Sequence, residues 1–259
     1  MLAVTDLTVH LGGRRILDAL SMQAQAGAVT VILGPNGSGK TTLLRAATGD
    51  LRYAGSVRLG GVEIAGAPLW RLAAVRGVLE QATPVAFAFT VAEVVRFGLG
   101  AGLSAGRAEV ARLALEEVGL ADLAERPFHE LSGGQQQRVH LARVRAQVWE
   151  PVSPEGPRWL FLDEPVASLD IAHQLAVMEV MRGFARAGGG VVAVMHDLNL
   201  SAMVADRIVL LAEGRVVAAG PPEAVIRDAP LSRAYGCPLR ANRAPAAGPW
   251  ILPQGAAAS

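Results

Sequence analysis

The chain has 259 residues, a length that fits a single α/β domain with a subdomain. A formal net charge of +1 gives no reason to expect a nucleic-acid partner, and a single cysteine excludes an intramolecular disulfide and suits a reducing compartment. No stretch approaches the roughly 18 apolar residues that would span a bilayer, and residues 1–6 lack the basic and apolar parts of a secretory signal, so we expect a cytoplasmic protein.

The first part of the chain predicts two hairpins and a strand that leads into a helix. Residues 7–11 alternate apolar and polar side chains and stop at a Gly-Gly pair, and residues 56–59 precede another such pair, so each pattern indicates an antiparallel hairpin. Residues 29–33 form a short β-branched run that is typical of a buried strand. A glycine-rich loop and a helix over residues 41–48 are expected directly after it.

The second part predicts a group of helices followed by another α/β block. Gly119 is well placed to end the second of these helices. The last stretch, residues 241–259, is rich in Ala, Pro and Gly, and we expect a terminal tail there. The expected elements are helices over 91–95, 108–118 and 171–187, strands over 159–163 and 191–195, and a closing hairpin over 207–212 and 215–218.

The glycine-rich loop at residues 34–41 matches the pattern G-x-x-x-x-G-K-[ST]. Its glycines let successive backbone N–H groups turn toward phosphate oxygens, and the N-terminus of the following helix favours the anion further. Lys40 is expected to reach the β- and γ-phosphates, and the Thr41 hydroxyl to ligate Mg²⁺. An ordinary glycine turn would explain this loop by itself but not the motifs that follow it.

Two carboxylates end the apolar strand at residues 160–164. Because adjacent side chains at a strand end point in different directions, Asp163 and Glu164 can take different roles, one in holding a metal and one as a base. A strand that ends in Asp-Glu is weak evidence in isolation, since acidic residues often cap strands. After a phosphate-binding loop it indicates nucleotide chemistry.

The string LSGGQQQR at residues 131–138 adds a second candidate anion site. Ser132, Gly133 and Gly134 precede a helix expected to run to about Trp149, so their hydroxyl and amide groups can face an anion. A Ser-Gly-Gly sequence is also a good helix N-cap in its own right. The loop at residues 34–41 already serves the nucleotide of the same chain, which leaves this second site without a ligand of its own.

These three elements, in this order, resemble those of the ABC-type ATPases, with LSGGQ as the signature. The resemblance covers about residues 2–240 and implies two chains packed head to tail, with each signature closing over the γ-phosphate of ATP held by the other chain. By resemblance, Asp163 holds Mg²⁺ through water, Glu164 is the general base, and His196 contacts the γ-phosphate. Gln81 resembles the glutamine that contacts Mg²⁺ or water and senses a membrane partner. Asp170 resembles the aspartate at the dimer seam.

The resemblance also implies the fold class and the division of the chain into subdomains. We expect an α/β fold with a RecA-like P-loop NTPase core, an antiparallel β subdomain and an inserted helical subdomain. The division would be a core at 1–84 and 158–240, a helical subdomain at about 85–157 and a tail at 241–259. The predicted ligands of ATP are Gly34, Pro35, Asn36, Gly37, Ser38, Gly39, Lys40, Thr41, Thr42, Ser132, Gly133, Gly134 and Gln135; those of Mg²⁺ are Thr41, Gln81 and Asp163.

The sequence departs from the family pattern in two places. The smaller departure is in residues 166–170, where one residue differs from the usual Ser-Ala-Leu-Asp and affects the expected contacts of Ala167; the larger departure is in the first hairpin. Where the family stacks adenine on an aromatic side chain of the first hairpin, this sequence has Leu11, with His10 beside it. Apolar packing by Leu11 would hold the base without the roughly 0.5–1.5 kcal/mol that stacking contributes.

Within the family, the chain is most similar to ATP-binding subunits of bacterial haem (hemin) importers. The similarity lies in residues 86–91 (AFAFTV), in residues 141–149 (LARVRAQVW), and in the Pro-rich insertion at 150–157 that leads into RWLFLDE. It implies a homodimer at the cytoplasmic face of the bacterial inner membrane, joined to two permease subunits and supplied by a periplasmic haem-binding protein. Iron-siderophore and vitamin B12 importers are alternatives for the cargo.

A soluble ATPase is the alternative from another class. Translation factors usually carry two ATPase cassettes and repair ATPases a long coiled coil, neither of which is present in this sequence, but an ATPase of iron–sulphur cluster assembly is also a single cassette. Residues 83–100 discriminate, because in an importer they should form an apolar groove for a helix of the membrane partner.

Overall fold

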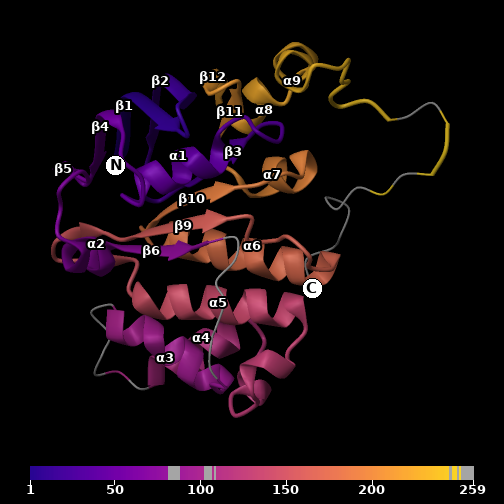
Figure 1. Ribbon diagram of the computed structural model, residues 1–259. Coiled ribbons are helices and arrows are strands. Elements are labelled where there is room, and N and C mark those ends of the chain that lie inside the picture. Colours follow the sequence, from indigo (N-terminus) through magenta and orange to yellow (C-terminus); the bar gives the residue numbers. More distant parts are fainter. Residues whose placement is uncertain (81–87, 102–106, 108, 245–246, 250, 252–259) are drawn as a thin grey trace.

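The structure is a computed structural model that describes residues 1–80, 88–101, 107, 109–244, 247–249 and 251. Two sheets and a group of helices are stacked in layers (Figure 1). An antiparallel sheet near the N-terminus covers one side of helix α1 (Lys40–Ala47), the central sheet lies on the other side of α1, and most of the remaining helices lie beyond the central sheet.

The central sheet follows from short, strongly apolar strands. Its order is β12-β11-β3-β10-β9-β6, and β11, β3, β10, β9 and β6 are mutually parallel. Every residue of β3, β9 and β10 is buried, which explains why these strands are continuous apolar runs rather than alternating ones. The strands are β3 (Val29–Leu33), β6 (Arg76–Leu79), β9 (Trp159–Asp163), β10 (Gly190–Val194), β11 (Arg207–Ala212) and β12 (Arg215–Gly220).

The parallel arrangement places the chemically important segments together. The carboxyl ends of neighbouring parallel strands meet at one edge of a sheet, where open α/β sheets bind their ligands. Here β3 leads into Gly34 and the glycine-rich loop, β9 ends at Asp163, and β10 is followed by Met195 and His196.

The antiparallel sheet has the order β2-β1-β4-β5. Both expected hairpins are present, and the first turns at Gly12 and Gly13, whose φ values of 55° and 78° lie in the left-handed region that favours glycine. Its buried side chains pack with those of α1 in one core cluster that includes Leu17, Leu43 and Val57. The strands are β1 (Leu2–Leu11), β2 (Arg14–Ala24), β4 (Ala54–Leu59) and β5 (Val62–Glu63).

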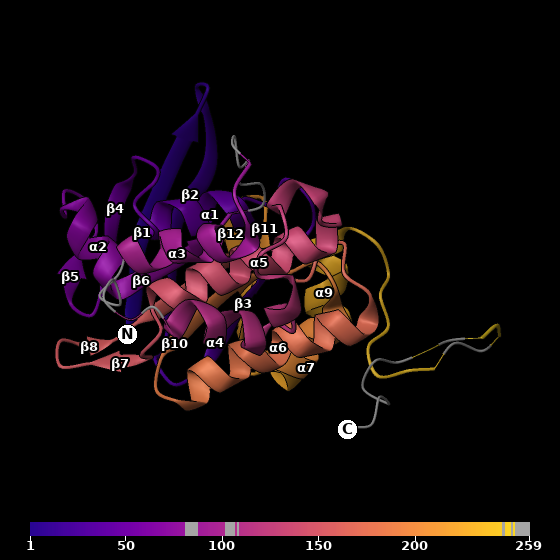
Figure 2. The same cartoon turned by 90° about the horizontal axis from the view of Figure 1, so that it is seen from below.

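The helices beyond the central sheet share a second core cluster with it. In Figure 2 they cross over the sheet, with α5 running along its face. Ser132 begins α5 as its N-cap, Gly119 with φ 67° follows α4, and Asp170 caps α6. The helices are α2 (Leu69–Val75), α3 (Val91–Ala101), α4 (Glu109–Glu117), η1 (Ala121–Leu123), η2 (Phe128–Glu130), α5 (Gly133–Gln147), α6 (Ile171–Arg186), α7 (Leu198–Val204), α8 (Pro222–Val225) and α9 (Asp228–Tyr235).

Several element boundaries differ from the sequence-based expectation. The first helix begins at Lys40 rather than residue 41 because the loop closes one residue earlier, and α5 ends at Gln147 rather than at about Trp149. The insertion at residues 150–157, counted with a helical subdomain, forms a small hairpin of β7 (Val152–Ser153) and β8 (Gly156–Pro157). The described residues of the expected tail at 241–259 form no helix or strand. No helix in the described part of the chain is long and apolar enough to cross a bilayer.

Two glycines on α3 allow a test of how closely the helices pack. A Cβ atom at Gly98 would lie 1.9 Å from the backbone oxygen of Arg143 on α5, whereas one at Gly100 would meet nothing within 4 Å. We expect Gly98→Ala to lower the free energy of unfolding by about 1–3 kcal/mol, because the two helix backbones must separate. The matched change Gly100→Ala should raise it by up to about 1 kcal/mol, because alanine favours the helix. Urea denaturation of both variants measures the difference, and equal effects would contradict the close contact.

Candidate active site

The glycine-rich loop, residues 34–39, joins β3 to α1 and leaves room for an anion. Its glycines are needed for packing as well as for conformation. A Cβ atom at Gly34 would lie 2.2 Å from the backbone oxygen of Leu211, and one at Gly39 would lie 2.6 Å from Cδ2 of Leu17. Both glycines also have positive φ, 150° and 100°. The loop is therefore held tightly against β11 and β2 on one side while its other side faces the cavity.

Lys40 lies inside this loop. Its Nζ donates hydrogen bonds to the backbone oxygens of Gly34 at 2.9 Å and Pro35 at 3.0 Å. Burial lowers the pKa of the Lys40 ammonium, and the nearby carboxylates of Glu164 and Asp163 oppose this shift. The result is a positive charge held by two backbone oxygens, at the place where a phosphate bound by the loop amides would be.

Thr41 and Asp163 face each other across the gap between α1 and β9. The Thr41 hydroxyl donates to Oδ1 of Asp163 at 3.4 Å. Burial raises the pKa of the Asp163 carboxyl, which is only 3% exposed, while the Thr41 hydrogen bond lowers it. A hydroxyl and a buried carboxylate are oxygen donors of the kind that Mg²⁺ prefers. The described residues contain no group of three or more His, Cys, Asp and Glu side chains able to hold a metal.

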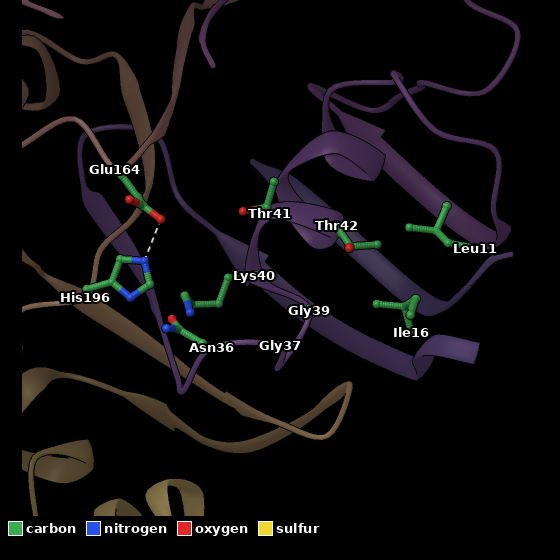
Figure 3. A pocket seen from close by; sticks show the side chains of 10 residues that line it. All are labelled: Leu11, Ile16, Asn36, Gly37, Gly39, Lys40, Thr41, Thr42, Glu164 and His196. Atoms are coloured by element: carbon green, nitrogen blue, oxygen red, sulfur yellow. Dashed lines mark hydrogen bonds and ion pairs between the residues drawn. The ribbon is translucent and has the colours of Figure 1, made fainter. Parts of the chain in front are cut away.

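Glu164 and His196 form the polar wall opposite the loop. His196 Nε2 and Glu164 Oε1 are 2.6 Å apart, and Figure 3 shows this pair facing Lys40 and Asn36. The backbone of Glu164 has φ 52°, a left-handed conformation that is uncommon for a residue with a side chain. This conformation turns the chain at the end of β9, so that Asp163 remains buried while Glu164 points into the cavity.

The cavity itself has a volume of about 850 Å³ and extends from His196 to the first hairpin. At the hairpin end, Figure 3 shows Leu11 of β1 and Ile16 of β2 side by side, with Thr42 between them and the glycine-rich loop. Leu11 thus lies where we expected an apolar contact to the base. We had not singled out Ile16; its apolar side chain on the same hairpin was the available signal.

The signature residues lie outside this cavity. Ser132 and Gly133 are exposed, and none of the residues 132–135 is among the described residues that line the cavity. Ser132 Oγ accepts a hydrogen bond from the Gln135 amide at 3.3 Å, and Gln135 Oε1 accepts one from the Ser132 amide at 3.0 Å, which completes a capping box. The first turn of α5 is therefore a rigid, exposed helix N-terminus whose remaining amides are open to an external anion.

Two other predicted residues have different outcomes. Gln81 lies outside the described residues. Asp170 is exposed at the start of α6, where its carboxylate accepts a hydrogen bond from the His173 amide at 2.9 Å and contacts the His173 ring. Gln137, which the sequence reasoning passed over, lies on α5 and donates from Nε2 to the backbone oxygen of Glu164 at 3.2 Å.

In this parallel sheet, strand β3 passes through the glycine-rich loop into α1, and an acidic pair lies at the end of β9, with β10 between the two strands. This arrangement defines the P-loop class of nucleotide-binding proteins. The profile of the family described as ABC transporter matches residues 17–167. The hemin import ATP-binding protein HmuV of Roseobacter denitrificans is 57% identical over 98% of this chain and 98% of its own length. HmuV of Jannaschia sp. is 57% identical over 95% of this chain and 91% of its own length. The chain belongs to the ABC transporter family, and it is an ATP-binding subunit of that type.

Solved structures agree with this assignment. A putative metal-chelate type ABC transporter in an inward-facing conformation matches with a TM-score of 0.74 and 25% identity, over 92% of this chain and 89% of that one. A dimeric ATP-binding cassette in a post-hydrolysis state, bound to ADP and phosphate, matches with a TM-score of 0.73 and 25% identity. The match covers 86% of this chain and 99% of that one.

Proposed function

We propose that this chain is the ATP-hydrolysing subunit of a haem importer. The observation that carries the proposal is the 57% identity, over nearly the full length of both chains, to a protein named for hemin import. The cavity at the end of the parallel strands adds the residue types that ATP hydrolysis requires.

Several residues around the cavity have a proposed role in hydrolysis. The amides of residues 34–39 and the helix N-terminus bind the β- and γ-phosphates, and Lys40 leaves its backbone partners to neutralise their charge. Thr41 and Asp163 would hold Mg²⁺, which neutralises charge on the phosphates. Glu164 takes the proton of the attacking water. His196, whose Nε2 is 2.6 Å from Glu164 Oε1, orients the Glu164 carboxylate and contacts the γ-phosphate.

Two copies of the chain would complete each site. The first turn of α5 at Gly133 and Gly134, behind the exposed Ser132, does not line the cavity of its own chain, so its amides would close over the γ-phosphate held by a second copy. A head-to-tail dimer satisfies both copies at once, with two ATP molecules in the seam. A likeness to a cassette that was solved as a dimer with ADP and phosphate supports this arrangement.

The arrangement across the seam can be tested with Ser132→Arg. The bulky cation should fill the amide cradle and reduce hydrolysis at least about 100-fold, while ATP binding to the monomer stays intact because residues 34–41 are unchanged. Ser132→Ala is the control, since it removes the cap, at a cost of about 1 kcal/mol, without filling the cradle. Turnover of all three proteins is measured with saturating MgATP. Loss of ATP binding in the Ser132→Arg monomer would contradict the proposal.

A mixture of Ser132→Arg and Lys40→Ala chains sharpens that test. If the signature acts across the seam, each mixed dimer has one site with both defects and one intact site, and part of the hydrolysis should return. If it acts within one chain, every site carries a defect and mixing restores nothing.

The remaining parts of the proposal concern the membrane. The homodimer would sit at the cytoplasmic face of the bacterial inner membrane, bound to two permease subunits that receive haem from a periplasmic binding protein. Uptake by proteoliposomes containing the whole complex tests the cargo, with haem, a ferric siderophore and vitamin B12 compared side by side. Likeness to a metal-chelate type transporter makes the siderophore the second candidate. ATP-dependent uptake of haem above the other two supports the proposal, whereas uptake of another cargo alone contradicts it.

Purification of the chain from its own cells tests the class of protein. Absence of any co-purifying membrane protein would favour a soluble ATPase, such as one of iron–sulphur cluster assembly.

A further inference from the structure

The side chain of Gln137 connects the signature segment to the Glu164 backbone. Gln137 lies on α5, about one turn after the N-cap Ser132, and it is half-buried. Its Nε2 donates a hydrogen bond to the backbone oxygen of Glu164 at 3.2 Å. The helix that carries the exposed amides for a second chain's phosphate therefore also contacts the proposed base of this chain's own site.

The backbone of Glu164 needs such support because of its conformation. A φ of 52° is unfavourable for a non-glycine residue and persists only where surrounding contacts hold it. The Glu164 amide donates to the backbone oxygen of Val194 at 3.0 Å, and its backbone oxygen also accepts from the Ala167 amide at 3.1 Å. These two contacts are between main-chain atoms. Among the described residues, Gln137 supplies the side-chain hydrogen bond to this peptide.

A second contact links the same two segments. A Cβ atom at Gly134, in the first turn of α5, would lie 3.0 Å from Cδ2 of Leu169 and 3.4 Å from the backbone oxygen of Ser168. Gln174 of α6 donates from Nε2 to the backbone oxygen of Val166 at 3.4 Å. The segment from residue 164 to residue 170 thus contacts both α5 and α6, and the first turn of α5 approaches it closely.

We propose that Gln137 is a positioning residue that sets Glu164 according to the position of the signature segment in the same chain. This inference rests on the proposed function, because it assumes that the signature amides bind phosphate held by a second copy. When those amides bind, the capped first turn of α5 is fixed as a unit, and Gln137 fixes the Glu164 peptide with it. The carboxylate is then held beside His196, so each site becomes active when the other is closed.

Substitution of Gln137 by an isostere without a donor tests this role. Gln137→Met keeps the length of the side chain but cannot donate, and Gln137→Glu places a carboxylate against the Glu164 carbonyl. We expect kcat to fall about five- to tenfold in the first variant and further in the second, with KM for ATP changed less than about twofold. The Hill coefficient for ATP should fall toward 1. Gln147→Met is the matched control, since Gln147, also on α5, donates to the backbone oxygens of Ala73 and Arg76 away from the cavity.

A double variant separates positioning from a general effect on folding. Adding Gln137→Met to Glu164→Gln should change the residual single-turnover rate less than about twofold, because the base that Gln137 positions is already gone. An unchanged kcat in Gln137→Met, an equal loss in Gln147→Met, or a multiplicative loss in the double variant overturns the inference. Failure of the wild-type chain to hydrolyse ATP, or of the Glu164→Gln chain to dimerise with it, would instead contradict the proposed function.

Discussion

Lys40→Ala is expected to abolish ATP turnover, with a loss of at least about 100-fold, and to weaken ATP binding strongly. Within the described part of the chain, the Lys40 ammonium donates hydrogen bonds to the backbone oxygens of Gly34 and Pro35, and phosphate oxygens would replace them with a full charge interaction. The result is measured by phosphate release and by equilibrium binding of ATP. Near-wild-type hydrolysis would show that the loop is not the phosphate site.

Arg45→Ala is a suitable control for that substitution. Arg45 lies on the same helix, is exposed and does not line the cavity with Lys40, so removing its charge should leave turnover within about twofold.

A second measurement of the role of Lys40 uses the fact that Lys40 is the only lysine in the sequence. A lysine-directed acylating reagent should modify the chain at Lys40 and at the amino terminus alone, and bound ATP should protect Lys40.

The second large effect is expected from Glu164→Gln. An amide has the shape of the carboxylate but is a poor base, so ATP should bind while hydrolysis falls by about 10²–10⁴-fold. The His196 ring can still hydrogen-bond to the amide oxygen, which keeps the wall of the cavity in place. Glu179→Gln, at an exposed site on α6, controls for the loss of one negative charge. Single-turnover kinetics measure the chemical step, and an unchanged rate in Glu164→Gln would exclude Glu164 as the base.

The sequence was sufficient for β3, β9 and β10 of the central sheet because burial made these strands continuous apolar runs, whereas β6 was not predicted. The strands at residues 29–33 and 159–163 were predicted with their observed bounds, and β10 differs by one residue. The loop and the acidic pair were found for the same reason, since each directly follows such a strand. Helix ends were less accurate, because they depend on caps and on neighbouring segments.

Three features of the site depend on tertiary contacts that no local pattern encodes. The left-handed conformation of Glu164 is held by Val194 on a neighbouring strand and by Gln137 on α5. Ile16 reaches the cavity because the hairpin folds over the end of α1, and its apolar side chain did not distinguish it in sequence from the other apolar residues of β2. The separation of the signature from the cavity was expected from the family resemblance rather than from a local pattern, and residues 132–135 are not among the described residues that line the cavity.

The most direct test of the central claim, that two chains enclose ATP between them, is the molar mass of Glu164→Gln in solution. Light scattering after gel filtration, with and without MgATP, distinguishes one chain of 27.0 kDa from two. We predict one chain without nucleotide and two with it, because the slowed hydrolysis preserves the nucleotide in the seam. Adding Ser132→Arg to the same chain should prevent the shift. A Glu164→Gln chain that binds ATP and still has the mass of a single chain would contradict the account.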